Sequence, residues 1–340
     1  MQKIPLKLNP TSYSYSHWCS HHITAQVGSG RSRLWPLERL FIACAFMLML
    51  FASSISMALS VAELQGEYRS GNYTAWLIAT DDNALELQLY QGSWPFKASQ
   101  QVWQSTLKIS NGQLQHGDNL VALASGAFSI KYKDQTLSLT KFVRRSPTLG
   151  LPAPKGAKIL FTHLDTTSLS QWLDTALSQK GYLREGGTTV DDFQSFDLHL
   201  EYRLPLEPSN RGQNRGNSGL YIFKRYEVQI LDNFGFEAGF TEAGALYRQK
   251  APDVNAALPP LTWQTLDISF DAPTMGWLGL ATGPLTISVY LNGQLVQDQV
   301  ALSETTGLWN KWRGNAGRGN LYLQDHWHAV EFNNIWLLPK

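Results

Sequence analysis

The sequence predicts an all-β protein in which a small antiparallel β-domain precedes a pair of packed β-sheets. Short segments that alternate apolar and polar residues recur along the chain, and Gly, Asn and Asp residues that favour turns separate them. Aromatic residues, which favour strands, make up 12% of the chain, whereas helical periodicity is nearly absent. A length of 340 residues is sufficient for two domains.

The first 60 residues predict a disordered extension followed by an export signal. Residues 1–30 are polar and lack apolar periodicity. Arginines within 31–39 then precede an apolar run over 40–52, and small residues follow up to Ser60. This pattern is typical of a secretory signal cleaved after Ser60, and an uncleaved membrane anchor over 40–59 is the alternative. We therefore expect export to the periplasm or the extracellular space.

Cysteine content and charge exclude some classes of protein. Cys19 and Cys44 lie in or before the export segment, so a mature chain would carry neither and would need no disulfide. The net charge of +1 gives no electrostatic reason to expect a nucleic-acid partner. Contact with a membrane is expected only through the signal or anchor segment.

Residues 61–145 form the predicted small β-domain, in which no cluster of titratable side chains stands out. Its strands are expected at 74–79, 84–90, 105–110, 120–123, 127–132 and 136–140. Residues 146–157 carry three prolines and two glycines, which resist helix and strand and predict a linker.

Residues 158–340 form the predicted second domain. A short helix is expected over 167–177, with Thr167 or Ser168 as its cap. Strands are expected at 196–203, in two segments within 217–232, and at 243–247, 263–270, 285–291, 321–324 and 330–337. The pair Asn292-Gly293 between apolar segments predicts a β-hairpin. Because strands dominate, we expect two packed sheets.

The stretch 217–232 organises this second domain, as two strands joined by a basic turn at Lys224. In the second strand, apolar side chains on one face would meet the core, and polar side chains on the other face would form a row spaced about 6.6 Å apart. The apolar set is Tyr226, Val228 and Ile230, and the polar row is Arg225, Glu227 and Gln229. A solvated outer face gives the same alternation. Asn217 and Asp232 at the two ends add polar groups that favour a site.

The late segment 321–326 alternates in the same way. Its leucines would face the core, so that Tyr322, Gln324 and His326 would face the same side as Glu227. His326 is the best candidate for acid–base chemistry because the pKa of imidazole lies near neutrality. Trp327 follows at once and would supply a stacking face.

Three further residues are second-rank candidates. Asp325 lies beside His326, and His199 and Glu201 alternate on the strand at 196–203. A solvated ladder with a cross-strand ion pair explains His199 and Glu201 equally well.

Eight short motifs in order resemble a known family, the 3-keto-disaccharide hydrolase domain, from about residue 158 to the C-terminus. They are Asn217-Ser218-Gly219-Leu220-Tyr221, the segment from Arg225 to Asp232, Gly244-Ala245-Leu246-Tyr247, Ala251-Pro252 with Asn255-Ala256, Trp263-Gln264-Thr265, Leu291-Asn292-Gly293, Leu323-Gln324-Asp325-His326, and Phe332-Asn333-Asn334-Ile335-Trp336. The resemblance implies a concanavalin-like jelly-roll β-sandwich after an amino-terminal β-module.

The resemblance also implies a reaction. The substrate would be a glycoside already oxidised to a ketone at C3, from which a base removes the C2 proton, the anomeric group leaves and water adds back. Glu227 and His326 would share one pocket as base and acid, in either order. The residues expected to bind substrate are Asn217, Arg225, Gln229, Asp232, Tyr247, Tyr322, Gln324 and Trp327. Hydrogen-bond donors or a divalent metal ion would stabilise the enolate, and no ligand spacing in the sequence identifies a metal site.

Two other functions stay open at this point. A non-catalytic carbohydrate-binding module would use the same fold with stacking aromatic residues and no titrating pair. A laminarinase-like glycosidase needs two close carboxyls, and here Gln229 occupies the middle of the row. No serine nucleophile elbow, phosphate loop or paired-cysteine zinc pattern is present in the sequence.

Overall fold

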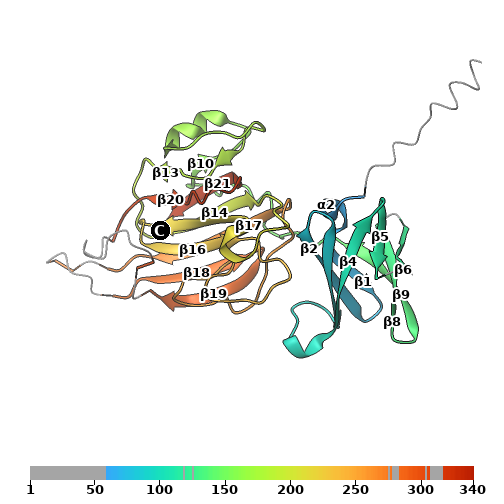
Figure 1. Ribbon diagram of the computed structural model, residues 1–340. Coiled ribbons are helices and arrows are strands. Elements are labelled where there is room, and N and C mark those ends of the chain that lie inside the picture. The colour runs from blue at the N-terminus through green and yellow to red at the C-terminus, as the bar shows by residue number, and fades with distance from the viewer. Residues whose placement is uncertain are drawn as a thin grey trace, which may run out of the picture. The chain divides into compact units, whose positions relative to one another are not determined.

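The computed structural model of the chain describes residues 59–117, 119–124, 126–274, 276–277, 283–302, 305–306 and 317–340. The predicted class is confirmed, because the described chain is built almost entirely from antiparallel strands (Figure 1). The predicted extension and the export or anchor segment lie outside the described residues, apart from Leu59 and Ser60. Within the described part of the chain, no helix combines the length and the hydropathy needed to span a membrane.

The small β-domain opens with a single helical turn, α2 (Val61–Leu64), which the sequence pattern did not predict. The Ser60 side chain accepts from the Glu63 backbone N–H, and the Glu63 carboxylate accepts from the Ser60 N–H, which forms a capping box. This reciprocal pair satisfies backbone donors that the first turn of a helix leaves unpaired.

Nine strands of the described chain form one antiparallel sheet in the order β6-β5-β4-β3-β2-β1-β9-β8-β7. They are β1 (Gly66–Ser70), β2 (Tyr73–Asp81), β3 (Ala84–Gln91), β4 (Gln101–Ser110), β5 (Gln113–His116), β6 (Asn119–Leu120), β7 (Ala122–Ala124), β8 (Ala127–Tyr132) and β9 (Gln135–Phe142), with the 3-10 turn η1 (Ala98–Gln100) before β4. Leu114 on β5 and Phe128 on β8 share one buried core with Leu77 and Leu87, so the sheet curls around its own apolar face.

The second domain packs two sheets face to face. Strands β10 (Lys158–Phe161), β21 (Glu331–Pro339), β14 (Phe196–Arg203), β17 (Trp263–Asp271), β18 (Thr286–Leu291) and β19 (Gln294–Ala301) form one sheet, to which β12 (Leu183–Arg184) adds beside β21. The other sheet, hereafter the site sheet, has the order β11 (Trp172–Leu173), β13 (Thr188–Thr189), β20 (Leu321–Leu323), β15 (Asn217–Ile222) and β16 (Tyr226–Leu231). The core between them joins Leu198 and Leu200 of β14 to Val228 and Ile230 of β16.

The predicted hairpin at Asn292-Gly293 is confirmed between β18 and β19. Both turn residues have positive φ, +52° and +77°, which is the backbone of the turn type that favours Asn-Gly. The predicted linker over 146–157 contains neither helix nor strand among its residues.

Two predicted elements are wrong. The helix expected over 167–177 is a short 3-10 helix, η2 (Thr166–Gln171), capped by Asp165. The chain then leaves the helical path, because β11 pairs with β13 and Trp172 is buried. The segment 243–247 is not a strand, although its backbone bonds to the edge of β16: Tyr247 N–H donates to the Glu227 carbonyl at 3.1 Å, and Gly244 N–H donates to the Gln229 carbonyl at 2.9 Å. A second 3-10 turn, η3 (Gly212–Asn214), precedes β15.

Candidate functional site

The site sheet positions the central polar row. β15 and β16 are antiparallel, with Tyr221 opposite Glu227 and Gly219 opposite Gln229. The apolar face predicted for β16 meets the core as expected. The solvated alternative for the polar face is wrong, because Glu227 is only 4% exposed and Gln229 only 1% exposed.

Glu227 is held by neighbours from the paired strand. The Tyr221 hydroxyl donates to Glu227 Oε2 at 2.7 Å. When its amide nitrogen is turned toward Glu227, as the local network of acceptors requires, Gln229 donates to Oε1 at 3.1 Å. Gly219 makes room for the carboxylate, since a Cβ at that position would lie 2.5 Å from Glu227 Oε1.

Burial raises the pKa of the Glu227 carboxyl to about 7, although the Tyr221 hydrogen bond and the positive charge of Arg248 favour its ionised form. No salt bridge to Glu227 is found among the described residues. A carboxyl that titrates near neutrality can both accept and return a proton, which suits general acid–base catalysis.

A cavity of about 410 Å³ lies beside this carboxyl and contains Tyr221 in its wall. Its lining residues are Asp174, Gly186, Thr188, Tyr221, Lys224, Tyr322, Gln324 and Asp325. The register of β15 and β20 places Tyr221 opposite Tyr322, with ring centroids 5.8 Å apart. The predicted facing of Tyr322 and Gln324 toward the side of Glu227 is thereby confirmed.

His326 follows β20 and is not among the residues that line this cavity. Its ring lies parallel to that of His328, with centroids 5.6 Å apart and 8° between the planes. Its Nδ1 atom is buried and has no hydrogen-bond partner among the described residues. His328 in turn lies 2.7 Å from a carboxylate oxygen of Glu207. A pocket shared by Glu227 and His326 therefore stays a prediction.

Comparison with known families identifies the family of this chain. A family model described as the 3-keto-alpha-glucoside-1,2-lyase-like domain matches residues 160–338, which is more than half of the chain. The chain belongs to this family. No curated protein matches it.

Solved structures with a similar arrangement include two proposed glycosyl hydrolases from Parabacteroides distasonis. The first is 28% identical, covers 56% of this chain and 86% of its own, and has a TM-score of 0.49. The second is 18% identical, covers 55% of this chain and 94% of its own, and has a TM-score of 0.38. Carbohydrate binding module CBM66 from Bacillus subtilis is 14% identical, covers 53% of this chain and 93% of its own, and has a TM-score of 0.27.

Asp232 is buried and does not line the cavity of the lyase-like domain, so its role in substrate binding stays a prediction. It forms a fully buried ion pair with Arg215, with Arg215 Nε 2.7 Å from Asp232 Oδ2. Arg215 also donates to the backbone carbonyls of Ala79 and Pro208. Burial raises the pKa of Asp232 to about 6 against the pull of Arg215. The pair fastens chain segments together.

Other predicted binding residues lie behind or beside the cavity wall. Asn217 is 1% exposed and donates to the Gln213 carbonyl at 2.8 Å. Arg225 is buried in the turn between β15 and β16. Tyr247 is half-buried at the edge of β16, and Trp327 is 88% exposed beyond β20. None of these four lines the described cavity.

His199 and Glu201 lie on the opposite side of the sandwich from Glu227. Both are on β14, whose alternate residues enter the core from the other sheet. His199 Nδ1 lies 2.5 Å from Asp267 Oδ1, and Glu201 accepts from the backbone of Gly150 at 2.6 Å. Glu201 therefore holds the linker against the sheet. The assignment of His199 and Glu201 as second-rank site residues stays a prediction.

Sequence reasoning missed cavity residues that come from turns. Lys224 was seen only as part of a basic turn, yet its ammonium lies 5.8 Å from the ring centre of Tyr322. Asp174 and Gly186 reach the wall from irregular segments with no pattern to mark them. Among the residues that the structure describes, no group of three or more His, Cys, Asp or Glu side chains is arranged to hold a metal ion.

Proposed function

We propose that this chain cleaves 3-keto-glycosides by elimination across C1 and C2, followed by hydration. The proposal rests mainly on the surroundings of Glu227. This buried carboxyl has a pKa raised to about 7 and accepts a hydrogen bond from Tyr221, which lies in the wall of an open cavity. Membership of the 3-keto-alpha-glucoside-1,2-lyase-like family supports carbohydrate chemistry of this kind.

The first step is loss of the C2 proton. The ketone at C3 acidifies this proton, because the electron pair left at C2 is delocalised onto the ketone oxygen as an enolate. Tyr221 lines the cavity and already donates to Glu227 Oε2 at 2.7 Å. We assign Glu227 as the base that finally holds the proton. The C2 proton passes to Tyr221 Oη, and at the same time the phenolic proton of Tyr221 moves to Glu227. Lys224 in the same cavity supplies positive charge for the enolate oxygen.

The second step breaks the C1–O bond. The electron pair of the enolate forms the C1=C2 double bond, and the departing glycosidic oxygen takes a proton. Tyr221 lines the cavity whereas His326 does not, which favours return of the proton from Glu227 through Tyr221. Water then adds its hydroxyl to C1 and its proton to C2, which restores a free 3-keto sugar.

The rival function is a carbohydrate-binding module. Tyr221 and Tyr322, whose ring centroids are 5.8 Å apart in the cavity wall, could hold a sugar without any reaction. A binder would not need a carboxyl whose ionisation is shifted to neutrality.

Exchange of the C2 hydrogen for deuterium separates the two functions. A 3-keto-glucoside in deuterium oxide should lose its C2 proton signal in NMR spectra with the native chain, and its aglycone should be released. Glu227→Gln should slow both by at least ~10²-fold, the usual effect of losing a general base. Glu242→Gln is the matched control, because burial also raises the pKa of Glu242 but this residue does not line the cavity.

His326→Ala decides the identity of the acid. If Glu227 and Tyr221 return the proton, exchange and release both stay near the native rate in this variant. If release falls by ~10²-fold while exchange persists, His326 is the acid and the sequence-based assignment holds. Binding of the keto sugar with neither exchange nor release by the native chain would favour the binding module and overturn the proposal.

A further inference from the structure

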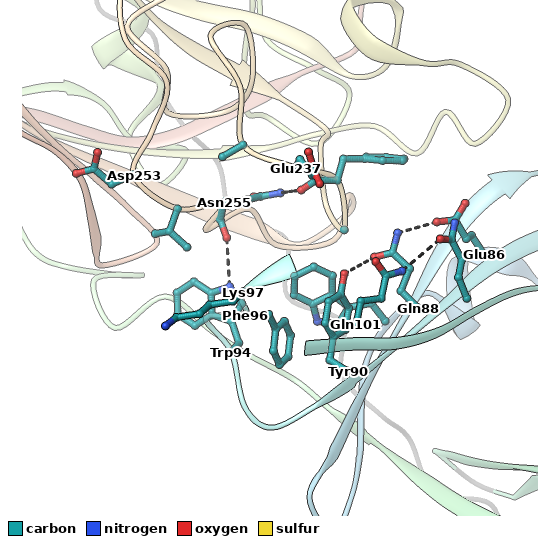
Figure 2. A pocket seen from close by; sticks show the side chains of 16 residues that line it. Glu86, Gln88, Tyr90, Trp94, Phe96, Lys97, Gln101, Glu237, Asp253 and Asn255 are labelled. Atoms are coloured by element: carbon teal, nitrogen blue, oxygen red, sulfur yellow. Dashed lines mark hydrogen bonds between the residues drawn. The ribbon is translucent and has the colours of Figure 1, made fainter. Parts of the chain in front are cut away.

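A second and larger cavity lies within the compact unit formed by residues 58–340, away from Glu227. Its volume is about 650 Å³, inside the range of roughly 300–1,000 Å³ that small-molecule sites occupy. One wall comes from the small β-domain, on β2, β3, the segment between β3 and β4, and the start of β4. The facing wall comes from 235–238 and 253–255 of the lyase-like domain (Figure 2).

Three partly exposed aromatic rings line this cavity. Phe96 stacks on Tyr90 with centroids 4.2 Å apart and 10° between the planes. The guanidinium of Arg144 lies 4.4 Å from the ring centre of Trp94, and Phe236 lines the opposite wall. These contacts fix the rings before a ligand arrives, and flat rings are the surface on which the apolar faces of sugars pack.

An ordered row of hydrogen-bonding groups runs beside the rings, as Figure 2 shows. Tyr90 donates to Gln88 at 2.8 Å, and Gln88 donates to Glu86 at 2.6 Å. Burial, followed by the nearby charges of Glu86 and Glu237, raises the pKa of Tyr90 to about 12, so its hydroxyl stays protonated at neutral pH. Paired amides and carboxylates in fixed positions match the neighbouring hydroxyls of a sugar ring.

One buried donor in the wall has no partner. The indole Nε1 of Trp76 donates to no group among the described residues, although Trp76 is only 6% exposed. An orphan donor of this kind is costly unless a ligand or water accepts from it. The wall around it is rigid, because Gly235 approaches Ile78 so closely that a Cβ at Gly235 would overlap it.

The charge of the lining selects among sugars. Glu86, Glu237 and Asp253 line the cavity, and Lys97 is the single basic residue in the lining that the structure describes. This excess of carboxylates disfavours uronic acids and sulfated or phosphorylated sugars.

We propose that this cavity binds a neutral oligosaccharide segment, at a site separate from the reaction centre. The inference rests on the carbohydrate family and on the lining itself, and it does not require the proposed elimination. Bound there, one stretch of a glucan would hold the chain near its sugar source while the cavity beside Tyr221 stays open.

Isothermal titration of the full chain tests the proposal, with maltohexaose, cellohexaose and laminarihexaose as probes. At least one should bind, and Phe96→Ala should weaken that binding by about tenfold, since a stacked ring contributes roughly 0.5–1.5 kcal/mol beyond its buried area. Gln104→Ala alters an exposed lining residue and should weaken binding severalfold without affecting the fold. Phe240→Ala, at a 60% exposed aromatic residue outside the lining, is the matched control and should bind as the native chain does.

The proposal is overturned if no probe binds, if the native chain, Phe96→Ala and Gln104→Ala bind equally well, or if an oligogalacturonate of the same length binds equally well. Glu227→Gln should bind the hexasaccharide normally, and Phe96→Ala should turn over a small 3-keto-glucoside normally. Loss of hexasaccharide binding in Glu227→Gln would place the sugar at the reaction centre and refute a separate site. A chain that binds through Phe96 but cleaves nothing would refute only the proposed reaction.

Discussion

Replacing Glu227 by Gln should stabilise the protein at neutral and alkaline pH. Glu227 is buried without a salt bridge among the described residues, and its pKa rises from 4.5 to about 7 in the folded chain. Between these two values the folded state holds a proton that the unfolded state has released. Stability therefore falls as pH rises through this window.

The magnitude follows from the size of the shift. Each pKa unit corresponds to about 1.4 kcal/mol, so ionising Glu227 in place costs about 3 kcal/mol of folding free energy above pH 7. The glutamine side chain of the Glu227→Gln variant has nearly the same shape and does not ionise. The gain in unfolding free energy of the variant over the native chain should grow by about 3 kcal/mol between pH 4 and pH 8.

Urea denaturation at several pH values measures this difference. Glu237→Gln serves as the control for replacing a carboxyl by an amide, because this side chain is exposed. If the Glu227→Gln curve runs parallel to the native curve from pH 4 to pH 8, burial does not perturb the Glu227 carboxyl and the assignment of the base loses its physical basis. The rate of cleavage, kcat/KM, should rise with pH through about 7 if Glu227 must be ionised.

Three further variants test the surroundings of this carboxyl. Tyr221→Phe removes both the proposed proton relay and the hydrogen bond that favours the ionised form of Glu227. The value of kcat/KM should therefore fall by at least ~10²-fold, and the pH at which the remaining activity reaches half its maximum should move upward; near-native kcat/KM with an unmoved profile would show that Tyr221 takes no part in the proton transfer. Gly219→Ala should displace the carboxylate and lower kcat with little change in KM, and native kinetics would show that the carboxylate tolerates the methyl group. Arg215→Ala leaves Asp232 buried and unpaired, which should cost roughly 3–5 kcal/mol of unfolding free energy; a melting temperature close to native would contradict the fastening role.

Strand periodicity predicted the faces of the sheets correctly. Val228 and Leu323 enter the core, and Tyr322 lines the cavity on the opposite face, as alternation requires. The turn at Asn292-Gly293 was equally readable, because its chemistry is local. What a strand pattern could not show is that the polar face of β16 is also buried, since the Gly219 gap and the neighbouring side chains that enclose Glu227 come from another strand and from loops.

The cavity itself depends on long-range placement. Lys224 and Asp174 reach it from turns that lie 50 residues apart in sequence and carry no shared motif. His199 shows the converse, because a histidine beside a carboxylate looks catalytic in sequence but here stacks on Trp336 and bonds to Asp267 on the far sheet. Whether a polar side chain lies near Glu227 depends on which sheet its strand joins, and the alternation of apolar and polar residues does not show this.

Glu227 and Asp232 lie five residues apart, and the structure gives the two carboxyls different electrostatic surroundings. Both are buried, and burial raises the pKa of each. Asp232 has the Arg215 guanidinium at 2.7 Å, so a proton arriving there would have to break a buried ion pair. Glu227 instead accepts from a neutral tyrosine that itself lines a cavity. A carboxyl without a close cation keeps its affinity for a proton, and a hydroxyl relay gives that proton a path to substrate. Because no described residue forms a salt bridge with Glu227, this difference supports the proposal that Glu227 rather than Asp232 acts as the base.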